Sequence, residues 1–227
     1  MTLRFAPLPV DLPPGSHGVR LDVADVAPLV AMMPAGDWPE AMRDAADSRR
    51  AHFLAGRLAA REAVRLLTGS DARIGRSDDG SPRWPDGVAG SISHYDGVAC
   101  AVAVDGSATG GIGVDIAPLL DGDRLRAVVR RCLTDAERAA GPSDADVSLA
   151  FAAKEAVFKA AHARVQRHIG FDEAEIAVLD AGAGTWTASL GHMLAVDLDT
   201  TSLTGTYAWD RSLVYAVVVL PTPSIGS

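Results

Sequence analysis

The sequence predicts an α+β fold built from two similar-sized lobes that meet near residue 110. A chain of 227 residues is long enough for one large domain or two small ones. Two long segments, 39–67 and 146–164, have the apolar spacing of helices. Each is accompanied by short alternating or apolar segments typical of a small, mainly antiparallel sheet. We therefore expect one long helix packed on one sheet in each half.

In the first half, a loosely alternating segment at 19–26 predicts a strand. The helix at 39–67 carries arginines between its apolar positions, and Thr68-Gly-Ser ends it. Segment 77–87 is rich in turn-forming residues, and a short strand follows it and ends in Ser-Ile-Ser-His. Two further strands are predicted at 98–104 and 112–116, joined by a turn at 105–107.

The second half opens with a short helix at 124–132. Thr134 and Glu137 have the spacing of a capping box that begins another helix. The helix at 146–164 follows the break at Gly141-Pro. The remainder reads as β-rich, and its expected strands are 176–179, 185–190, 204–209 and 213–220.

Composition excludes several functional classes. The formal net charge of −8 argues against general nucleic-acid binding. No run of eighteen apolar residues predicts a membrane span, and the first ten residues do not resemble a signal peptide. Cys100 and Cys132 lack metal-ligand spacing, so we expect two buried thiols. These features predict a cytoplasmic protein, and two lobes in one chain make a monomer the simplest expectation.

The only two lysines of the chain, Lys154 and Lys159, flank Glu155 in one helix. A GC-rich genome explains why lysine is rare, but not why both share a helix. Glu155 and Lys159 have the spacing of an ordinary surface ion pair. However, Phe151 and Phe158 lie on the same helical face as Glu155, which predicts that this face turns inward. A carboxylate beside two cations, near a second carboxylate such as Asp115, suits a Mg²⁺ ion that holds phosphate oxygens.

Three other patterns suggest chemistry, although each also has an ordinary structural explanation. Asp115 ends an apolar strand after Gly110-Gly-Ile-Gly, where an aspartate is often a turn former. The strand that ends in Ser91-Ile-Ser-His94 is expected to present its hydroxyls and an imidazole to a polyanion, while a single histidine is often structural. Arg49 and Arg57 lie about 12 Å apart along one helix side, which fits a phosphate cradle or a solvated face. No nucleophile elbow, zinc motif or Walker loop occurs.

Taken together and in this order, the four patterns resemble the 4'-phosphopantetheinyl transferases of the Sfp/EntD type, most closely the EntD-like branch. The matching segments are Arg49-Arg-X-X-Phe-X-X-Gly-Arg57, Trp84-Pro-Asp-Gly-X-X-Gly-Ser91, Ser91-X-Ser-His94, Gly113-Val-Asp115 and Lys154-Glu-Ala-X-X-Lys159. They span roughly residues 45–180.

The resemblance implies an enzyme that moves the phosphopantetheine arm of coenzyme A onto a serine of an apo acyl or peptidyl carrier protein. It also implies Mg²⁺ dependence and the release of 3',5'-ADP. The implied fold is pseudo-twofold, with an N-terminal lobe at 1–110 that binds phosphates and a C-terminal lobe at 111–227 that binds metal. Fatty-acid, polyketide and nonribosomal-peptide carriers all fit, and the EntD-like character favours secondary metabolism such as siderophore synthesis.

Roles for individual residues follow from the same resemblance. Asp115 and Glu155 are expected to ligate Mg²⁺, and Glu155 is the expected base for the carrier serine. Lys154 and Lys159 are expected to hold pyrophosphate or 3'-phosphate oxygens, with Lys159 in a catalytic role. The remaining phosphate ligands are expected to be Arg49, Arg57, His94 and Arg83.

Two departures from the family pattern stand out. Many members have a second acid two residues after the aspartate, where this chain has Ala117, so weaker magnesium binding is expected. Many members also carry a lysine in the loop before the histidine motif, where this chain has Asp78-Asp79. Arg83 and Arg76 are the candidates to compensate for that lysine.

The alternative to an active transferase is a weakened module that binds coenzyme A or carrier proteins, with Ala117 as a sign of decay. A generic magnesium phosphohydrolase is a third possibility. Carrier proteins are commonly acidic, so an acidic enzyme needs a local basic surface to meet them. The candidates are Arg124, Arg126, Arg130 and Arg131, which also fit an ordinary solvated helix face.

Overall fold

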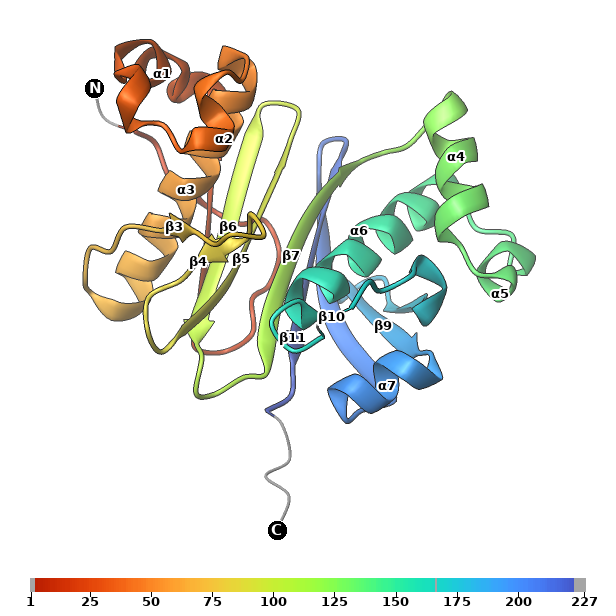
Figure 1. The fold of residues 1–227 in the computed structure, drawn as a ribbon. Helices are drawn as coiled ribbons and strands as arrows, with labels where there is room; N and C mark the ends of the chain where they lie inside the picture. The colour runs from red at the N-terminus through yellow and green to blue at the C-terminus, as the bar shows by residue number, and fades with distance from the viewer. Residues whose placement is uncertain (1–2, 166, 223–227) are drawn as a thin grey trace.

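The computed structural model describes residues 3–165 and 167–222, which form two antiparallel sheets with a long helix on each (Figure 1). The four-stranded sheet has the order β1-β2-β6-β5, with bounds Ala6–Pro7, Ser16–Asp22, Val98–Asp105 and Val88–Tyr95. The five-stranded sheet has the order β7-β11-β10-β9-β8, with bounds Gly111–Pro118, Leu213–Leu220, Ser202–Asp210, Thr185–Leu190 and Ala174–Asp180. A small hairpin pairs Gly75–Arg76 (β3) with Pro82–Arg83 (β4).

The helices are Ala27–Met32 (α1), Glu40–Arg43 (α2), Asp47–Thr68 (α3), Gly122–Cys132 (α4), Asp135–Ala139 (α5), Asp144–Ala161 (α6) and His192–Leu198 (α7). Short 3₁₀ segments occur at Val23–Asp25, Ala35–Asp37 and Phe171–Glu173. The predicted α+β class is confirmed, because α3 lies on one antiparallel sheet and α6 on the other.

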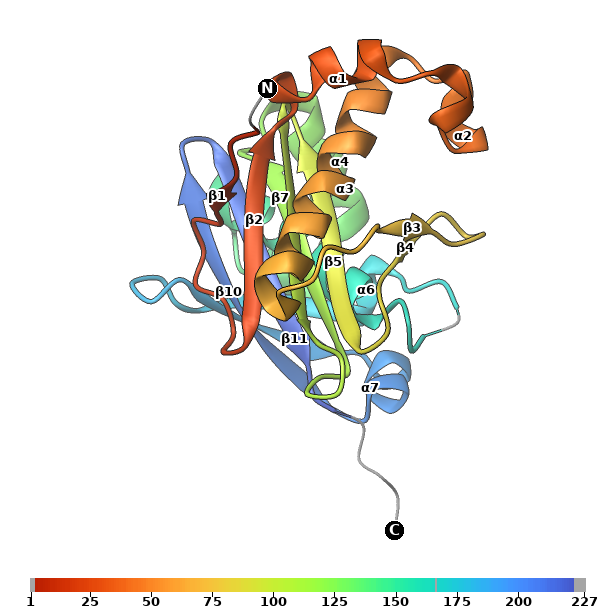
Figure 2. The ribbon, with the colours of Figure 1, turned by 90° about the vertical axis from the view of Figure 1, so that its left-hand side faces the viewer.

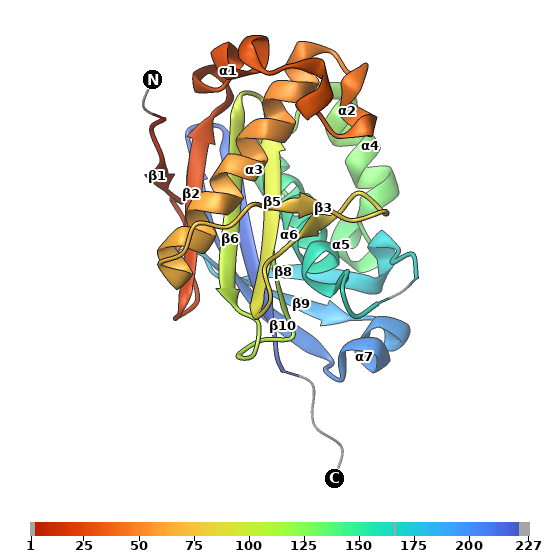
Figure 3. The ribbon, with the colours of Figure 1, turned by 60° about the vertical axis from the view of Figure 1, so that its left-hand side comes forward.

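The apolar strands are uninterrupted runs of apolar residues because both faces of each strand are buried. Ala101 and Ala103 of β6 pack against the alanine-rich side of α3, which crosses β2, β6 and β5 (Figures 2 and 3). Val102 of the same strand packs against the second sheet, beside Val114. On the far side, α6 packs against Val214 and alternate residues of β11. The layers therefore run α3, first sheet, second sheet, α6.

Two serine hydroxyls join the neighbouring edges of the sheets. The Ser91 hydroxyl of β5 accepts the Val114 amide of β7 at 3.1 Å, and the Ser93 hydroxyl accepts the Ile116 amide at 3.2 Å. Both serines are buried. They thereby satisfy amides at a sheet edge that would otherwise be left unpaired. The Ser-X-Ser hydroxyls consequently serve the fold, and the expectation that they face a polyanion is wrong.

Several predicted boundaries change. The helix expected at 39–67 is divided into α2 and α3, because Trp38 and Met42 fold back into the core and Arg50 donates to the Met42 carbonyl at 2.9 Å. The turn at 105–107 connects strands of different sheets, since Gly110 donates its amide to Leu220 of β11. Helix α7 was not expected, although Leu194 and Leu198 have helical spacing and are buried.

Both cysteines are free and buried, as predicted. Complete burial raises the pKa of Cys100 to about 12. Within the described ranges, no helix has the length and apolar character needed to cross a membrane.

Candidate active site

Glycines allow α6 to lie directly on β7, and this close approach builds the first half of the site. A Cβ atom at Gly113 would lie 1.9 Å from the Ala156 carbonyl oxygen, and one at Gly111 would lie 2.3 Å from that of Ala160. Side chains of alternate residues share one face of a strand. Asp115, two residues after Gly113, therefore points toward the same helix that carries Glu155 and Lys159.

Asp115 is held by two donors. Its Oδ1 atom accepts Ser93 Oγ at 2.7 Å and Lys159 Nζ at 2.6 Å. Lys159 also donates to the Val114 carbonyl at 3.2 Å and keeps 30% of its side chain exposed. The structure thus brings together Asp115 and Lys159, and it leaves the lysine accessible to a ligand.

Glu155 lies close enough to Asp115 for the two charges to interact. Its pKa is raised, first by burial and then by the Asp115 charge, while Lys159 acts in the opposite direction. A cation between the two carboxylates would relieve this repulsion. The carboxylate is consequently a better proton acceptor than an ordinary glutamate, once it is ionised.

The two carboxylates fit a magnesium ion that completes its shell with water and substrate phosphates. Across residues 3–165 and 167–222, no cluster of three or more metal-ligating side chains occurs. Ala117 points to the same side of β7 as Asp115 and is completely buried against α6. The protein therefore offers two carboxylates to a magnesium ion, and the methyl group of Ala117 occupies the position where a third carboxylate could lie.

The second half of the site is a cavity of about 420 Å³ between α3, β5 and the β3–β4 hairpin. Its lining residues are Met42, Arg49, His52, Phe53, Gly56, Arg57, Arg76, Gly80, Pro82, Ile92 and His94. None of these described lining residues is acidic. The cavity is therefore lined by three arginines and two histidines, with no carboxylate among the lining residues to neutralise their positive charge. Such a lining is typical of a pocket that binds anions.

Buried polar atoms without partners point to the same cavity. Within the described chain, Arg57 Nε and His52 Nδ1 are buried and make no hydrogen bond. Burial, followed by the nearby charge of Arg76, lowers the pKa of Arg57 to about 10. Its guanidinium also lies 5.1 Å above the Phe53 ring. A bound anion would supply the missing acceptor and offset the cost of burying these groups.

His94 stands between the two halves. Its pKa is lowered, chiefly by burial and then by the charges of His52 and Lys159, with Asp115 opposing them. His94, which was predicted from the Ser-X-Ser-His pattern, therefore lines the anion pocket. It also lies close enough to Lys159 and Asp115 for their charges to affect its pKa. Arg49 and Arg57 line the same pocket, as their spacing on α3 suggested.

The hairpin before β5 supplies Arg76 to the pocket in place of Arg83. Arg83 is exposed on β4 and is not a lining residue, so the structure does not bring it to the site. Asp79 turns to His162 at 2.9 Å and accepts the Ser81 amide and hydroxyl, which lower its pKa to about 2. Asp79 is thus held by His162 and Ser81, and neither Asp78 nor Asp79 lines the anion pocket.

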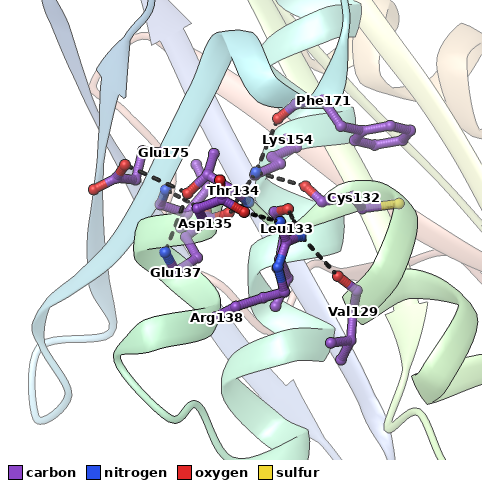
Figure 4. A network of polar contacts seen from close by, with 11 residues as sticks. Val129, Cys132, Leu133, Thr134, Asp135, Glu137, Arg138, Lys154, Phe171 and Glu175 are labelled. Carbon is purple, nitrogen blue, oxygen red and sulfur yellow. Dashed lines mark hydrogen bonds and ion pairs between the residues drawn. The ribbon is translucent and has the colours of Figure 1, made fainter.

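Lys154 belongs to the fold, and the expectation that it holds phosphate oxygens is corrected. It is completely buried. Its ammonium donates to Glu137 Oε2 and the Cys132 carbonyl at 2.7 Å, and to the Phe171 carbonyl at 2.9 Å (Figure 4). Glu137 in turn accepts the Ile176 amide at 2.7 Å. The network joins α4, α5, α6 and β8, and all three ammonium protons are used within it.

Sequence reasoning named most of the residues gathered here, but it missed His52. This histidine follows Arg49 by three residues on the cavity side of α3. Its helical spacing from Arg49 and Gly56 was the available signal. The sequence alone could not show that the facing strand would place His94 beside it.

Comparisons with known proteins agree with this geometry. Residues 38–104 match the 4'-phosphopantetheinyl transferase N-terminal domain, and residues 111–217 match the 4'-phosphopantetheinyl transferase superfamily. The chain is 33% identical to 4'-phosphopantetheinyl transferase PptT of Mycobacterium tuberculosis over 185 residues, which covers 76% of this chain and 79% of that protein.

Two other relatives match a shorter part. Enterobactin synthase component D of Salmonella typhi is 37% identical, over 62% of this chain and 59% of its own length. The transferase Svp of Streptomyces mobaraensis is also 37% identical, over 49% of this chain and 47% of its own length. Since PptT is matched over more than three quarters of both chains, and both lobes match family models, this chain belongs to the 4'-phosphopantetheinyl transferase superfamily.

Proposed function

We propose that the protein transfers the phosphopantetheine arm of coenzyme A to a serine of an apo carrier protein. The observation that carries this proposal is the adjacency of a carboxylate-free anion pocket to the Asp115–Glu155–Lys159 cluster. Such a pair of sites can hold a nucleotide with several phosphates at one end and perform chemistry on its pyrophosphate at the other.

In this proposal the anion pocket binds the 3'-phosphate of coenzyme A. Arg57 and His94 supply donors from two elements, and Arg49 provides an exposed guanidinium at the rim. Arg76 adds the charge that the loop lysine supplies in other family members. Guanidinium groups suit phosphate because they donate two parallel hydrogen bonds.

The chemistry follows from the second cluster. Glu155 takes the proton of the carrier serine, whose oxygen attacks the phosphorus that bears the pantetheine arm. The bond from that phosphorus to the bridging oxygen breaks, and 3',5'-ADP leaves. Lys159 balances the negative charge that develops on the leaving group. A magnesium ion held by Asp115 and Glu155 would neutralise the pyrophosphate.

A mass measurement on the carrier tests the function. The protein is incubated with coenzyme A, magnesium chloride and a panel of apo carrier proteins of the fatty-acid, polyketide and nonribosomal-peptide types. We expect at least one carrier to gain the mass of phosphopantetheine. Unchanged carriers together with tight coenzyme A binding would support a binding module, and free phosphopantetheine without a carrier would support a hydrolase.

We propose helix α4 as the docking surface for the carrier protein. Arg124, Arg126, Arg130 and Arg131 are all exposed on it. Arg124 donates to the Tyr95 hydroxyl at 2.6 Å, which places the start of this helix beside the residue that follows His94. An acidic carrier that binds here would present its serine close to the reacting groups.

Charge reversal at Arg126 and Arg130 is therefore expected to raise the KM for the carrier roughly tenfold. Charges at the edge of a protein–protein interface speed the association of the two partners. The KM for coenzyme A should stay the same. Reversal of Arg61 and Arg65, which have the same spacing on α3, is the matched control. Steady-state assays that vary each substrate separately measure both constants. Equal changes for carrier and coenzyme A would contradict docking on α4.

The buried methyl group of Ala117 leads to a further prediction. Ala117→Glu should lower the magnesium concentration that gives half-maximal activity, since a third carboxylate joins Asp115 and Glu155. Ala117→Gln has nearly the same size without the charge and should lack this effect. A thermal melt separates the metal effect from the cost of overpacking, which is about 1–3 kcal/mol. Identical magnesium dependence in all three proteins would refute a role for this position.

A further inference from the structure

A second imidazole lies in the anion pocket opposite His94. The ring centroids of His52 and His94 are 5.1 Å apart, and their planes are tilted by 53°. They come from different elements, α3 and β5. Both histidines border the main cavity and a neighbouring hollow of about 410 Å³, which Ser48, Arg49, Tyr95 and Asp96 also line.

The surroundings of this pair are mainly cationic. The charged or titratable groups around it are Arg49 and Arg57 of α3, Arg76 of β3, Tyr95 of β5, Asp96 after it, Lys159 of α6 and Asp115 of β7. Burial and then the nearby positive charges oppose protonation of His94 when no anion is bound. A dianion in the cavity reverses this balance, because it attracts the added proton.

The state of His52 also favours a ligand. Its Nδ1 atom is buried, and the described residues offer it no hydrogen-bond partner. An unpaired buried nitrogen is costly, so a ligand oxygen that pairs with the ring, or that draws a proton onto it, improves the site. A phosphate monoester suits this role, since its second pKa of about 6 leaves it doubly charged at neutral pH.

Building on the proposed function, we propose that His52 is a specificity residue for the 3'-phosphate of coenzyme A, and that the His52–His94 pair takes up a proton when this phosphate binds. The pocket then distinguishes coenzyme A from the same molecule without its 3'-phosphate through both charge and protonation. Arg57 and the other guanidinium groups remain charged in either state and supply the constant part of the attraction.

Calorimetric titration in buffers with different heats of ionisation tests this proposal. At about pH 7.5 the free phosphate is already a dianion, so proton uptake comes from the protein. We expect wild-type protein to take up protons with coenzyme A and almost none with 3'-dephospho-coenzyme A. His52→Gln should reduce the uptake and weaken coenzyme A binding about tenfold or more, while leaving the affinity for the dephosphorylated molecule nearly unchanged.

His192→Gln, an exposed histidine on α7, is the matched control and should behave as wild type. Thermal melts establish that His52→Gln is folded. The affinity of wild type should also fall more steeply than that of His52→Gln between about pH 6 and pH 8. Normal coenzyme A binding with unchanged proton uptake in His52→Gln would overturn this inference alone. Absence of coenzyme A binding in wild type would overturn the proposed function with it.

Discussion

Replacing Glu155 by glutamine is expected to reduce phosphopantetheine transfer by roughly 10²–10⁴-fold, the usual contribution of a general base. The amide is nearly the same size as the carboxylate but can neither take the serine proton nor attract a metal ion. The effect should fall on kcat, because the anion pocket that we propose binds coenzyme A is left intact. Carrier mass measurements at saturating coenzyme A give this rate directly. Glu175→Gln, an exposed glutamate on β8, is the control.

The same variant should be more stable than wild type when magnesium is absent. Because the fold raises the pKa of Glu155, the native state keeps this proton to a higher pH than the unfolded state. Glu155 therefore contributes its full stabilisation below the pKa that it has in the unfolded state. This contribution is lost as the pH rises through the pKa that it has in the folded state. At neutral pH the ionised carboxylate faces Asp115 at a cost, and Glu155→Gln removes it.

Magnesium should reverse the order of stability. At about a hundred times its Kd, the ion stabilises wild type by about 2.7 kcal/mol, or roughly 5–10 °C in Tm for a chain of this size. This increase should be larger at neutral pH than in acid, where Glu155 is protonated. Glu155→Gln should lose most of it. An equal magnesium shift in both proteins would exclude Glu155 as a metal ligand, whatever the effect on transfer.

Local patterns predicted those parts of the site that depend on one element. The strand that ends in His94, the glycine-rich approach to Asp115 and the arginine spacing of α3 each occupy a continuous stretch of chain. Gly113 is informative because only a residue without Cβ allows the Ala156 carbonyl so close to the strand. These features are fixed by steric rules that apply within a few residues.

Features that depend on two distant elements could not be predicted in this way. The Ser91 and Ser93 hydroxyls were expected to meet a ligand, yet they pair with β7 amides more than twenty residues away. The choice between Arg76 and Arg83 depends on how the short β3–β4 hairpin lies over α3. In each case the side-chain type predicted polar chemistry correctly, and the packing of the sheets decided which partner it meets.

Helical geometry also explains why the two lysines have different roles. Residues five apart on a helix are separated by about 140° around its axis, so Lys154 and Lys159 cannot share one face. Glu155 and Lys159 are only about 40° apart and both turn toward Asp115. Lys154 turns instead to Glu137, seventeen residues earlier, in a contact that no local pattern specifies.

Lys154→Met should therefore mainly reduce stability, whereas Lys159→Met should mainly reduce transfer. Removing Lys154 leaves the buried Glu137 charge and two carbonyls without their donor, so the free energy of unfolding should fall by about 3–5 kcal/mol. Removing Lys159 affects a partly exposed pair with Asp115 and should cost far less stability while it strongly reduces transfer. Urea unfolding and the carrier assay, applied to both variants, measure the two effects.

A second change distinguishes a lost ion pair from simple loss of packing. Glu137→Gln in the Lys154→Met background removes the unpaired charge and keeps an amide oxygen for the Ile176 amide, while the Thr134 amide loses its acceptor Oε2. The double variant should recover part of the lost stability, because an uncompensated buried charge costs more than a neutral group. If the double variant is instead less stable than Lys154→Met by the full cost of Glu137→Gln alone, the charges are not coupled. The hydrogen bonds to the Cys132 and Phe171 carbonyls would then account for the role of Lys154.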